Sequence, residues 1–139
     1  MAVFLNNKVG VKINSVDLSD HVTQVTLNRN FDELEVTAMG DTSHKFVTGL
    51  EASSITVSFL NDTASASVLQ RIQDNWGTTV PVSMIQQKGT AVSATNKTYA
   101  TTVLIDNVTD INGAVGDEST IDITFTCNSK IVPSSSTAF

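Results

Sequence analysis

The sequence predicts a mainly β fold, namely a β-sandwich or partly closed barrel of about seven strands with one flanking α-helix. Two patterns support this prediction. Residues 118–128 alternate strictly between apolar and polar side chains, which is typical of a strand with one face in a core and the other in water. Similar alternation recurs along the chain, whereas only one segment has apolar residues at helical spacing.

The predicted strands follow one another at residues 9–13, 21–30, 53–60, 79–86, 99–108 and 118–128. In the second of these, Val22 is out of phase with Val25 and Leu27, which predicts a β-bulge near Thr23. Residues 33–38 alternate too, and they either extend the second strand or begin a new one.

Two strands carry additional information. Pro81 indicates that the strand at residues 79–86 lies at a sheet edge or begins there, because proline has no N–H to donate. Val103, Leu104 and Ile105 make the strand at residues 99–108 apolar on both faces, which predicts that it is sandwiched or contacts another subunit.

One helix is predicted at residues 64–76, with Asn61, Asp62 and Thr63 offering N-cap chemistry and Gly77 ending it in the left-handed conformation. Its apolar side chains form a single stripe that ends with Trp76, so this tryptophan is expected in the core. The stripe consists of Ala64, Val68, Leu69, Ile72 and Trp76.

Residues 39–50 follow neither the strand period nor the helix period, so a long loop is predicted there. Loops of about twelve residues without secondary structure are uncommon and tend to be functional or flexible. Phe46 and Val47 favour burial against a partner over permanent disorder. We therefore expect an inter-subunit loop, poorly ordered in an isolated subunit, whose contact residues are Gly40, Asp41, His44, Lys45, Phe46, Val47 and Gly49.

Length and charge limit the function. A chain of 139 residues is the size of one domain, which we place at residues 1–132, followed by a flexible C-terminal tail at residues 133–139. The net charge is −6, and no Lys or Arg lies between Lys97 and Lys130. Tight nucleic-acid binding needs cations and is not expected. The acidic residues form either an ordinary solvated face or a surface that repels polyanions.

No catalytic equipment is apparent. The segment 17–21 brings two carboxylates and an imidazole together, but an Asp/Ser turn before a strand explains it better than a metal site does. Ser43 and His44 lack a nucleophile elbow. Cys127 falls in the apolar register of a strand and is expected to be a small core residue. We expect no enzyme activity, no metal and no cofactor. The apolar run at residues 3–5 is too short for a signal-peptide core, and no membrane association is expected.

The order and spacing of several short motifs resemble the major tail proteins, or tail tube proteins, of long-tailed bacteriophages. The motifs cover nearly the whole chain and comprise residues 16–22, 25–29, 33–34, 37–42, 49–50, 77–80, 91–96 and 113–116. The resemblance implies a β-sandwich subunit with a flanking helix, six subunits per ring, and rings stacked into a tube through which the genome passes. It also implies that residues 38–50 are the long loop that reaches neighbouring subunits or rings.

The implied partners are copies of the chain itself and other tail proteins, with DNA passing without specific binding. The implied location is the virion tail, after synthesis in the host bacterial cytoplasm. A face with small hydroxyls and one carboxylate suits a lumen, although β-propensity alone also favours Thr there. The candidate lumen-facing residues are Thr120, Asp122, Thr124 and Thr126, with Ser54, Thr56 and Ser58 as companions on a neighbouring strand. A head-decoration protein, a tail terminator and a monomeric ligand-binding β-sandwich are the alternatives.

Overall fold

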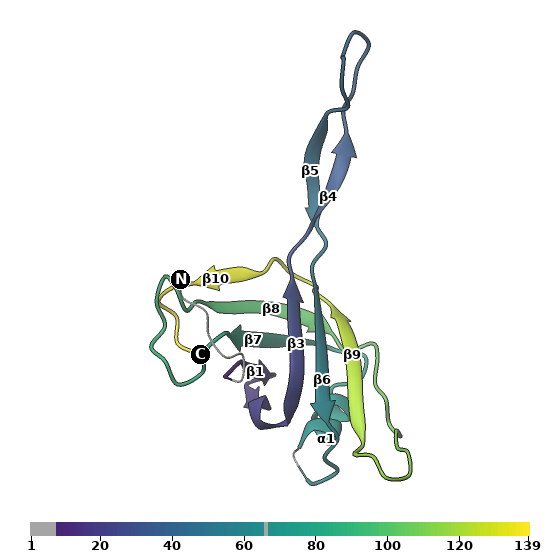
Figure 1. Cartoon of the computed structure of the whole chain (residues 1–139), viewed down its shortest axis with the longest axis vertical. Helices are drawn as coiled ribbons and strands as arrows, with labels where there is room; N and C mark the ends of the chain where they lie inside the picture. Colours follow the sequence, from purple (N-terminus) through teal and green to yellow (C-terminus); the bar gives the residue numbers. More distant parts are fainter. Residues whose placement is uncertain (1–7, 66) are drawn as a thin grey trace.

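The computed structural model of the chain describes residues 8–65 and 67–139. In these residues, ten strands form three antiparallel sheets, two of which enclose a common core while the third projects away as a hairpin (Figure 1). The predicted mainly β fold is confirmed, and the sheets of the sandwich stay open rather than closing into a barrel. The apolar run at residues 3–5 lies outside the described residues.

The first sheet has five strands in the order β10-β8-β7-β1-β2. The two-residue turn of Asn14 and Ser15, with φ of 52° and 66°, joins β1 to β2, so the first strand ends where the sequence predicted. β8 is paired on both sides, and Val103 and Ile105, which share one face, are buried, whereas Leu104 on the other face is only partly buried; that both faces of this segment are covered stays a prediction. The strands of this sheet are β1 (Gly10–Ile13), β2 (Val16–Asp17), β7 (Thr79–Ile85), β8 (Thr98–Leu104) and β10 (Val132–Ser134).

Pro81 lies in an interior strand, so the prediction of an edge or first-residue position is wrong. Its carbonyl oxygen accepts a 2.8 Å hydrogen bond from the N–H of Asn14, which shows that its polar groups point past the end of β1 into the turn. A missing N–H therefore breaks no ladder bond at this position. At the other end of the chain, Pro133 and Ser134 belong to β10, so regular structure extends into the expected tail, whose mobility stays a prediction.

The second sheet consists of β3 (Val22–Asn28), β6 (Ser54–Leu60) and β9 (Thr120–Thr126) in the order β3-β6-β9. The pairing of β3 with β6 shifts between Val22 and Gln24, which confirms the predicted bulge. β9 alternates as the sequence predicted, with every second side chain buried. The fully buried residues of this sheet are Ile55, Val57, Phe59, Ile121, Ile123 and Phe125.

The helix α1 (Val68–Asp74) is shorter than predicted at both ends. Its N-cap is Ser67, because Asp62 instead accepts hydrogen bonds from the Ala64 N–H and the Ser67 hydroxyl and forms a turn ahead of the helix. Val68, Leu69 and Ile72 enter the core as expected. The prediction for Trp76 is wrong, since the helix has ended and this side chain is 55% exposed. Gly77 has the predicted positive φ, at 75°.

The third sheet corrects the loop predicted at residues 39–50. β4 (Phe31–Glu35) pairs with β5 (Phe46–Glu51), so Phe46, Val47 and Gly49 lie in a strand. The alternating residues near Leu34 thus begin a new strand. A Cβ on Gly49 would come within 3.1 Å of the Cβ of Asp32 and 3.3 Å of Leu34, which explains a glycine inside β5.

Candidate functional site: an extended arm and a polar sheet face

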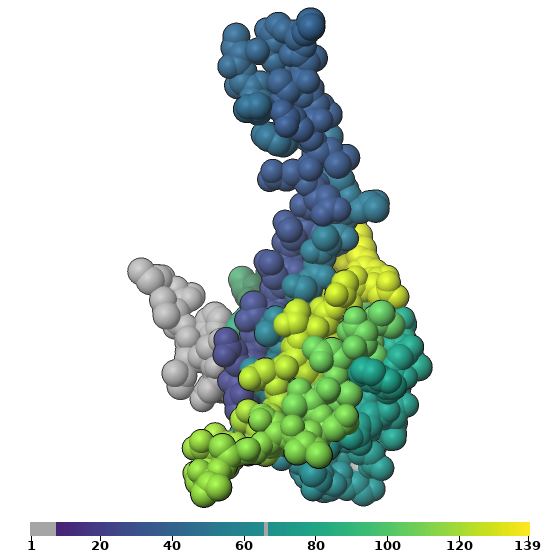
Figure 2. All heavy atoms as spheres, turned by 90° about the vertical axis from the view of Figure 1, so that its right-hand side faces the viewer, coloured from purple at the N-terminus to yellow at the C-terminus, as the bar shows by residue number. Residues whose placement is uncertain are grey.

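The hairpin of β4 and β5 forms an arm, here residues 31–51, that stands away from the sandwich (Figure 2). At its base, the N–H of Ala52 donates a 2.7 Å hydrogen bond to the carbonyl oxygen of Asn30. Apart from their pairing with each other, β4 and β5 make no more than marginal contact with any other named element of the described residues. The sandwich, which we call the body, therefore holds the arm only through its two-stranded base.

The arm is rich in exposed apolar side chains and has no buried residue. Leu34 lies opposite Val47 on one face of the hairpin, and Phe46 lies opposite Glu35 on the other. An isolated hairpin is marginally stable in water, and grouped apolar exposure marks an interaction site. Seven of the twelve exposed large hydrophobic residues in the described chain belong to the arm, namely Phe31, Leu34, Val36, Met39, Phe46, Val47 and Leu50.

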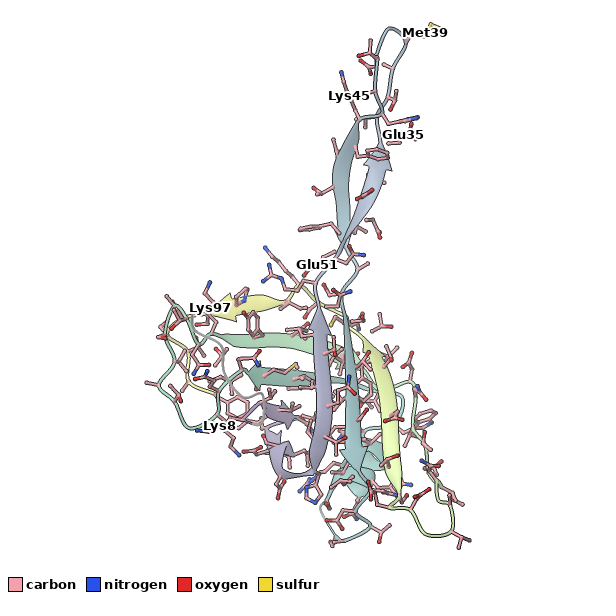
Figure 3. All side chains as sticks on the ribbon, in the orientation of Figure 1. Lys8, Glu35, Met39, Lys45, Glu51 and Lys97 are labelled. Atoms are coloured by element: carbon pink, nitrogen blue, oxygen red, sulfur yellow. The ribbon has the colours of Figure 1, made fainter. Side chains whose placement is uncertain are left out.

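The tip of the arm is organised by its own hydrogen bonds. Asp41 accepts a 2.8 Å hydrogen bond from the N–H of Ala38 and pairs at 2.8 Å with Lys45, and these two contacts lower the pKa of its carboxyl group. Gly40 has a φ of 87°, which its turn requires. Met39 lies at the outer end of the arm, and Glu35 and Lys45 lie closer to the body (Figure 3). The predicted contact residues thus gather at the tip and along β5.

His44 makes a specific contact within the arm. Its Nδ1 lies 2.7 Å from Oε1 of Glu35, and its ring centroid lies 6.4 Å from that of Phe46. The imidazole is therefore oriented by a carboxylate on the opposite strand and borders the aromatic ring of Phe46. This arrangement suits a docking surface.

The outer face of the three-stranded sheet carries short polar side chains and one charge. Asp122 lies opposite Ser58, and Thr56 lies opposite Thr124 with their hydroxyl oxygens 3.2 Å apart. The predicted companion residues Ser54, Thr56 and Ser58 thus lie on β6 beside β9, and the polar face continues onto β3. Because Ile55, Val57 and Phe59 of β6 and Ile121, Ile123 and Phe125 of β9 point into the core, the residues between them point away from it. The face consists of Gln24, Thr26, Asn28, Ser54, Thr56, Ser58, Thr120, Asp122, Thr124 and Thr126, with the exposed Leu60 opposite Thr120 at one end.

The segment 17–21 has a structural role. Asp17 pairs with Lys88 at 2.6 Å; burial raises the pKa of Asp17, but the hydrogen bonds from Lys88 and Ser19 outweigh it and lower the pKa to about 2. His21 lies between two carboxylates, with Nδ1 2.8 Å from Asp20 and Nε2 2.9 Å from Asp62. In the described residues, no three His, Cys, Asp or Glu side chains are placed to hold a metal ion.

Cys127 follows β9 and is half-buried. Burial raises the pKa of its thiol, which disfavours the reactive thiolate. None of the helices in residues 8–65 and 67–139 has the length and apolar composition of a membrane-spanning helix.

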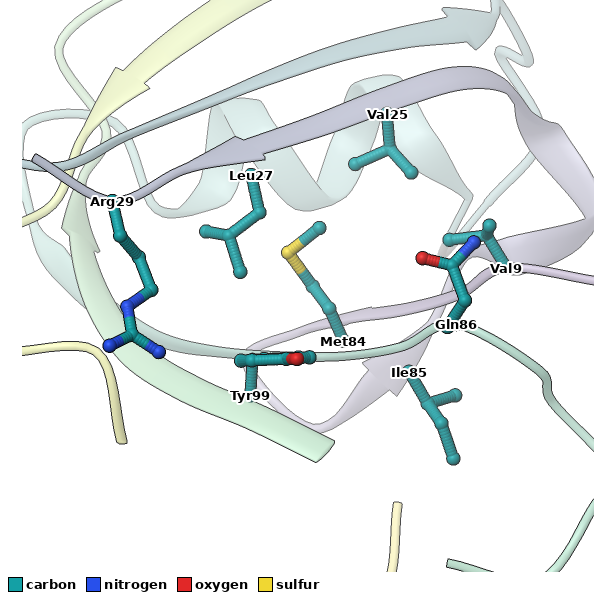
Figure 4. Close-up of a pocket in the computed structure, with 8 residues that line it drawn as sticks. All are labelled: Val9, Val25, Leu27, Arg29, Met84, Ile85, Gln86 and Tyr99. Carbon is teal, nitrogen blue, oxygen red and sulfur yellow. The ribbon is translucent and has the colours of Figure 1, made fainter. Parts of the chain in front are cut away.

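A pocket of about 320 Å³ opens between the two layers of the sandwich beside β3. Figure 4 shows Val25 and Leu27 pointing from β3 toward Met84 and Tyr99, with Arg29 reaching down one side. No sequence pattern predicted this pocket, because its walls come from strands far apart in the chain. The partial apolar burial that marks it becomes visible only in the fold.

No family model matches the chain, and no curated protein matches it. Solved structures do resemble it. A chain from the virion of a native gene transfer agent particle has a TM-score of 0.75 at 11% identity, covering 95% of this chain and 99% of that one. The SPP1 tail tube gives a TM-score of 0.73 at 11% identity, covering 94% and 78%.

A third structure, of the sheath/tube terminator of the extracellular contractile injection system PVC, gives a TM-score of 0.71 at 12% identity, covering 96% and 98%. The TM-scores establish a shared fold, and at identities this low the similarity shows the fold alone. In all three structures the similarity extends over nearly the whole of this chain. This chain therefore has the fold seen in tail-tube and terminator structures.

Proposed function

We propose that this chain is the structural subunit of a tail tube: copies associate into rings of six subunits, and the rings stack into a conduit for a genome. The observation that carries this proposal is the arm, which exposes apolar residues on both of its faces. Such a segment is stabilised when another molecule covers it. A second copy is the partner that the fold of the SPP1 tail tube suggests.

The sheet edges supply a second argument. In the named strands of the described chain, β3 and β9 each pair only with β6, so each has an outer edge without a neighbouring strand. An edge of this kind can pair with another chain. If β9 of one copy meets β3 of the next, the contact is heterologous and closes into a ring when the rotation permits. The polar face would then form one wall of that ring.

The polar face suits the inner wall of such a ring. Its residues include Asp122 and no cation, so it offers phosphate groups no positive charge, and its mostly short side chains leave the channel open. In this proposal Thr120, Asp122, Thr124 and Thr126 face the lumen. The role is structural and needs no cofactor.

Light scattering coupled to size-exclusion chromatography, followed by negative-stain electron microscopy, tests the proposal. We expect rings or tubes whose amount rises with protein concentration, with interfaces above ~1,000 Å². A monomer at every concentration would contradict the proposal and favour a ligand-binding module.

A tail terminator is the second candidate, because the sheath/tube terminator structure resembles the chain nearly as closely as the tail tube does. A terminator would form a single ring that binds the end of a tube and does not polymerise. Micrographs of the purified protein at high concentration distinguish the two, since only a tube subunit forms long polymers by itself.

A further inference from the structure

We propose that the pocket beside β3 receives the Phe46 side chain from the arm of another copy, and that Glu33 of that arm pairs with Arg29 at the pocket rim. This inference rests on the proposed self-assembly. It adds the receiving surface on this chain and the residues that would make the contact.

The pocket has the character of an unfilled part of the core. On β6 and β9 the inward-facing apolar residues are fully buried, whereas Val25 and Leu27, the inward-facing residues of β3, remain partly exposed. Met84 and the half-buried Tyr99 form the opposite wall. An apolar side chain placed between these walls would complete the burial of β3, and removing this apolar surface from water would stabilise the contact.

Charge favours the arm as the occupant. The arm contains five carboxylates and one lysine, namely Asp32, Glu33, Glu35, Asp41, Glu51 and Lys45. The pocket is lined by the cation Arg29, and Figure 3 places Lys8 and Lys97 on the side of the body to the left of β3. The side chains of these three cations form no ion pair within the described residues. An acidic arm thus complements the arginine that lines the pocket.

The pairing within the arm selects the contact residues. Phe46 shares one face of the hairpin with Glu33, Glu35 and Thr48, because Glu35 lies opposite Phe46 and Glu33 lies opposite Thr48. Glu35 is already held by His44 at 2.7 Å, whereas Glu33 has no salt-bridge partner in the described chain. This face therefore presents an aromatic ring beside an available carboxylate, which matches an apolar pocket with an arginine at its rim.

The arm that fills the pocket must belong to a second copy. Each arm extends away from its own body (Figure 1), and its residues cannot turn back to the pocket while the base remains closed between Asn30 and Ala52. A contact between the arm of one copy and the pocket of another is heterologous, so it can propagate from subunit to subunit.

Charge reversal tests the pairing. We expect Arg29→Glu and Glu33→Arg each to raise the protein concentration needed for assembly by roughly five- to tenfold, and the double variant to restore it largely. Lys130→Glu and Glu118→Arg are matched controls, because they make the same charge changes outside the pocket lining and the arm. Circular dichroism checks that every variant is folded.

Cross-linking locates the contact. In a Cys127→Ser background, a Thr48→Cys protein is mixed with a Val25→Cys protein, assembled and oxidised, and a disulfide-linked dimer is expected.

The outcomes separate the pocket proposal from the proposed function. If the wild-type protein assembles but the double charge-reversal variant is not rescued and no disulfide-linked dimer forms, the pocket proposal is overturned while the proposed function stands. A link formed instead between Phe4→Cys and Val25→Cys of one chain identifies the N-terminal segment as the occupant and also overturns the proposal. A wild-type protein that never assembles overturns both.

Discussion

The Ala52 N–H and the Asn30 carbonyl oxygen lie 2.7 Å apart and close the base of the arm where it leaves the body. The chain therefore enters and leaves the arm at neighbouring points, and the core residues all lie outside it. This arrangement makes the arm separable from the body. Folding and assembly can then be tested independently.

Replacing residues 31–51 by an Asn-Gly turn should leave a folded monomer that does not polymerise. The turn matches the separation of Asn30 and Ala52, and the core loses no side chain. Far-UV circular dichroism and thermal unfolding check the fold, and light scattering checks assembly. Tubes of normal length from this variant would show that the arm is not the connector.

Asp122→Lys should permit assembly but slow genome release from otherwise intact particles. The side chain lies on the polar face, away from the core, and a lysine there would introduce a cation able to hold phosphate groups. Asp122→Asn is the matched control, since it removes the charge without adding a cation. Release kinetics equal to the wild type in both variants would argue against a lumenal position.

Ile123→Ala should destabilise the protein by about 2–5 kcal/mol, because Ile123 is 1% exposed and its truncation leaves a cavity in the core. The neighbouring Thr124→Ala should change the free energy of unfolding by only about 0.5 kcal/mol, since Thr124 lies on the outer face. Urea unfolding of the two variants measures the contrast. Equal effects would mean that β9 does not alternate as described.

His21 should make stability depend on pH. Partial burial lowers the pKa of His21, but hydrogen bonds and charges from Asp62 and Asp20 outweigh it, so the folded pKa is raised above 6.5. The contribution is therefore complete below pH 6.5 and is lost as the pH rises through the folded pKa. Asp62, whose pKa is lowered from 3.8 by its hydrogen bonds from Ala64, Ser67 and His21, remains charged throughout this window.

Unfolding midpoints of the wild type and His21→Gln, measured from pH 5 to pH 8, check this expectation. The two proteins should differ most at the acidic end and converge as the pH rises. A difference that is constant over the range, or that grows toward alkaline pH, would contradict the assigned role of His21.

The strands of the sandwich could be predicted because burial on one face imposes alternation. β9 and the bulge near Thr23 are examples, and the polar face of β9 follows from the same pattern. The strand β5 could not be recognised in this way. Both faces of the arm are exposed, so burial imposes no alternation, and Gly49 reads as a loop residue although close packing against Asp32 requires it.

The errors at the helix and at Pro81 have tertiary causes. Asp62 is occupied by His21 and Ser67, so the helix begins later than its capping chemistry suggests. Pro81 is tolerated in an interior strand because a turn, rather than β1, lies beside it. The pocket beside β3 depends on how two layers meet, which no local pattern encodes.

A density map of the assembled protein from cryo-electron microscopy tests the central claim most directly. We expect stacked rings in which Thr120, Asp122, Thr124 and Thr126 line the lumen and each arm is covered by another copy. A map with Asp122 on the outer surface and the arms free in solvent would contradict it.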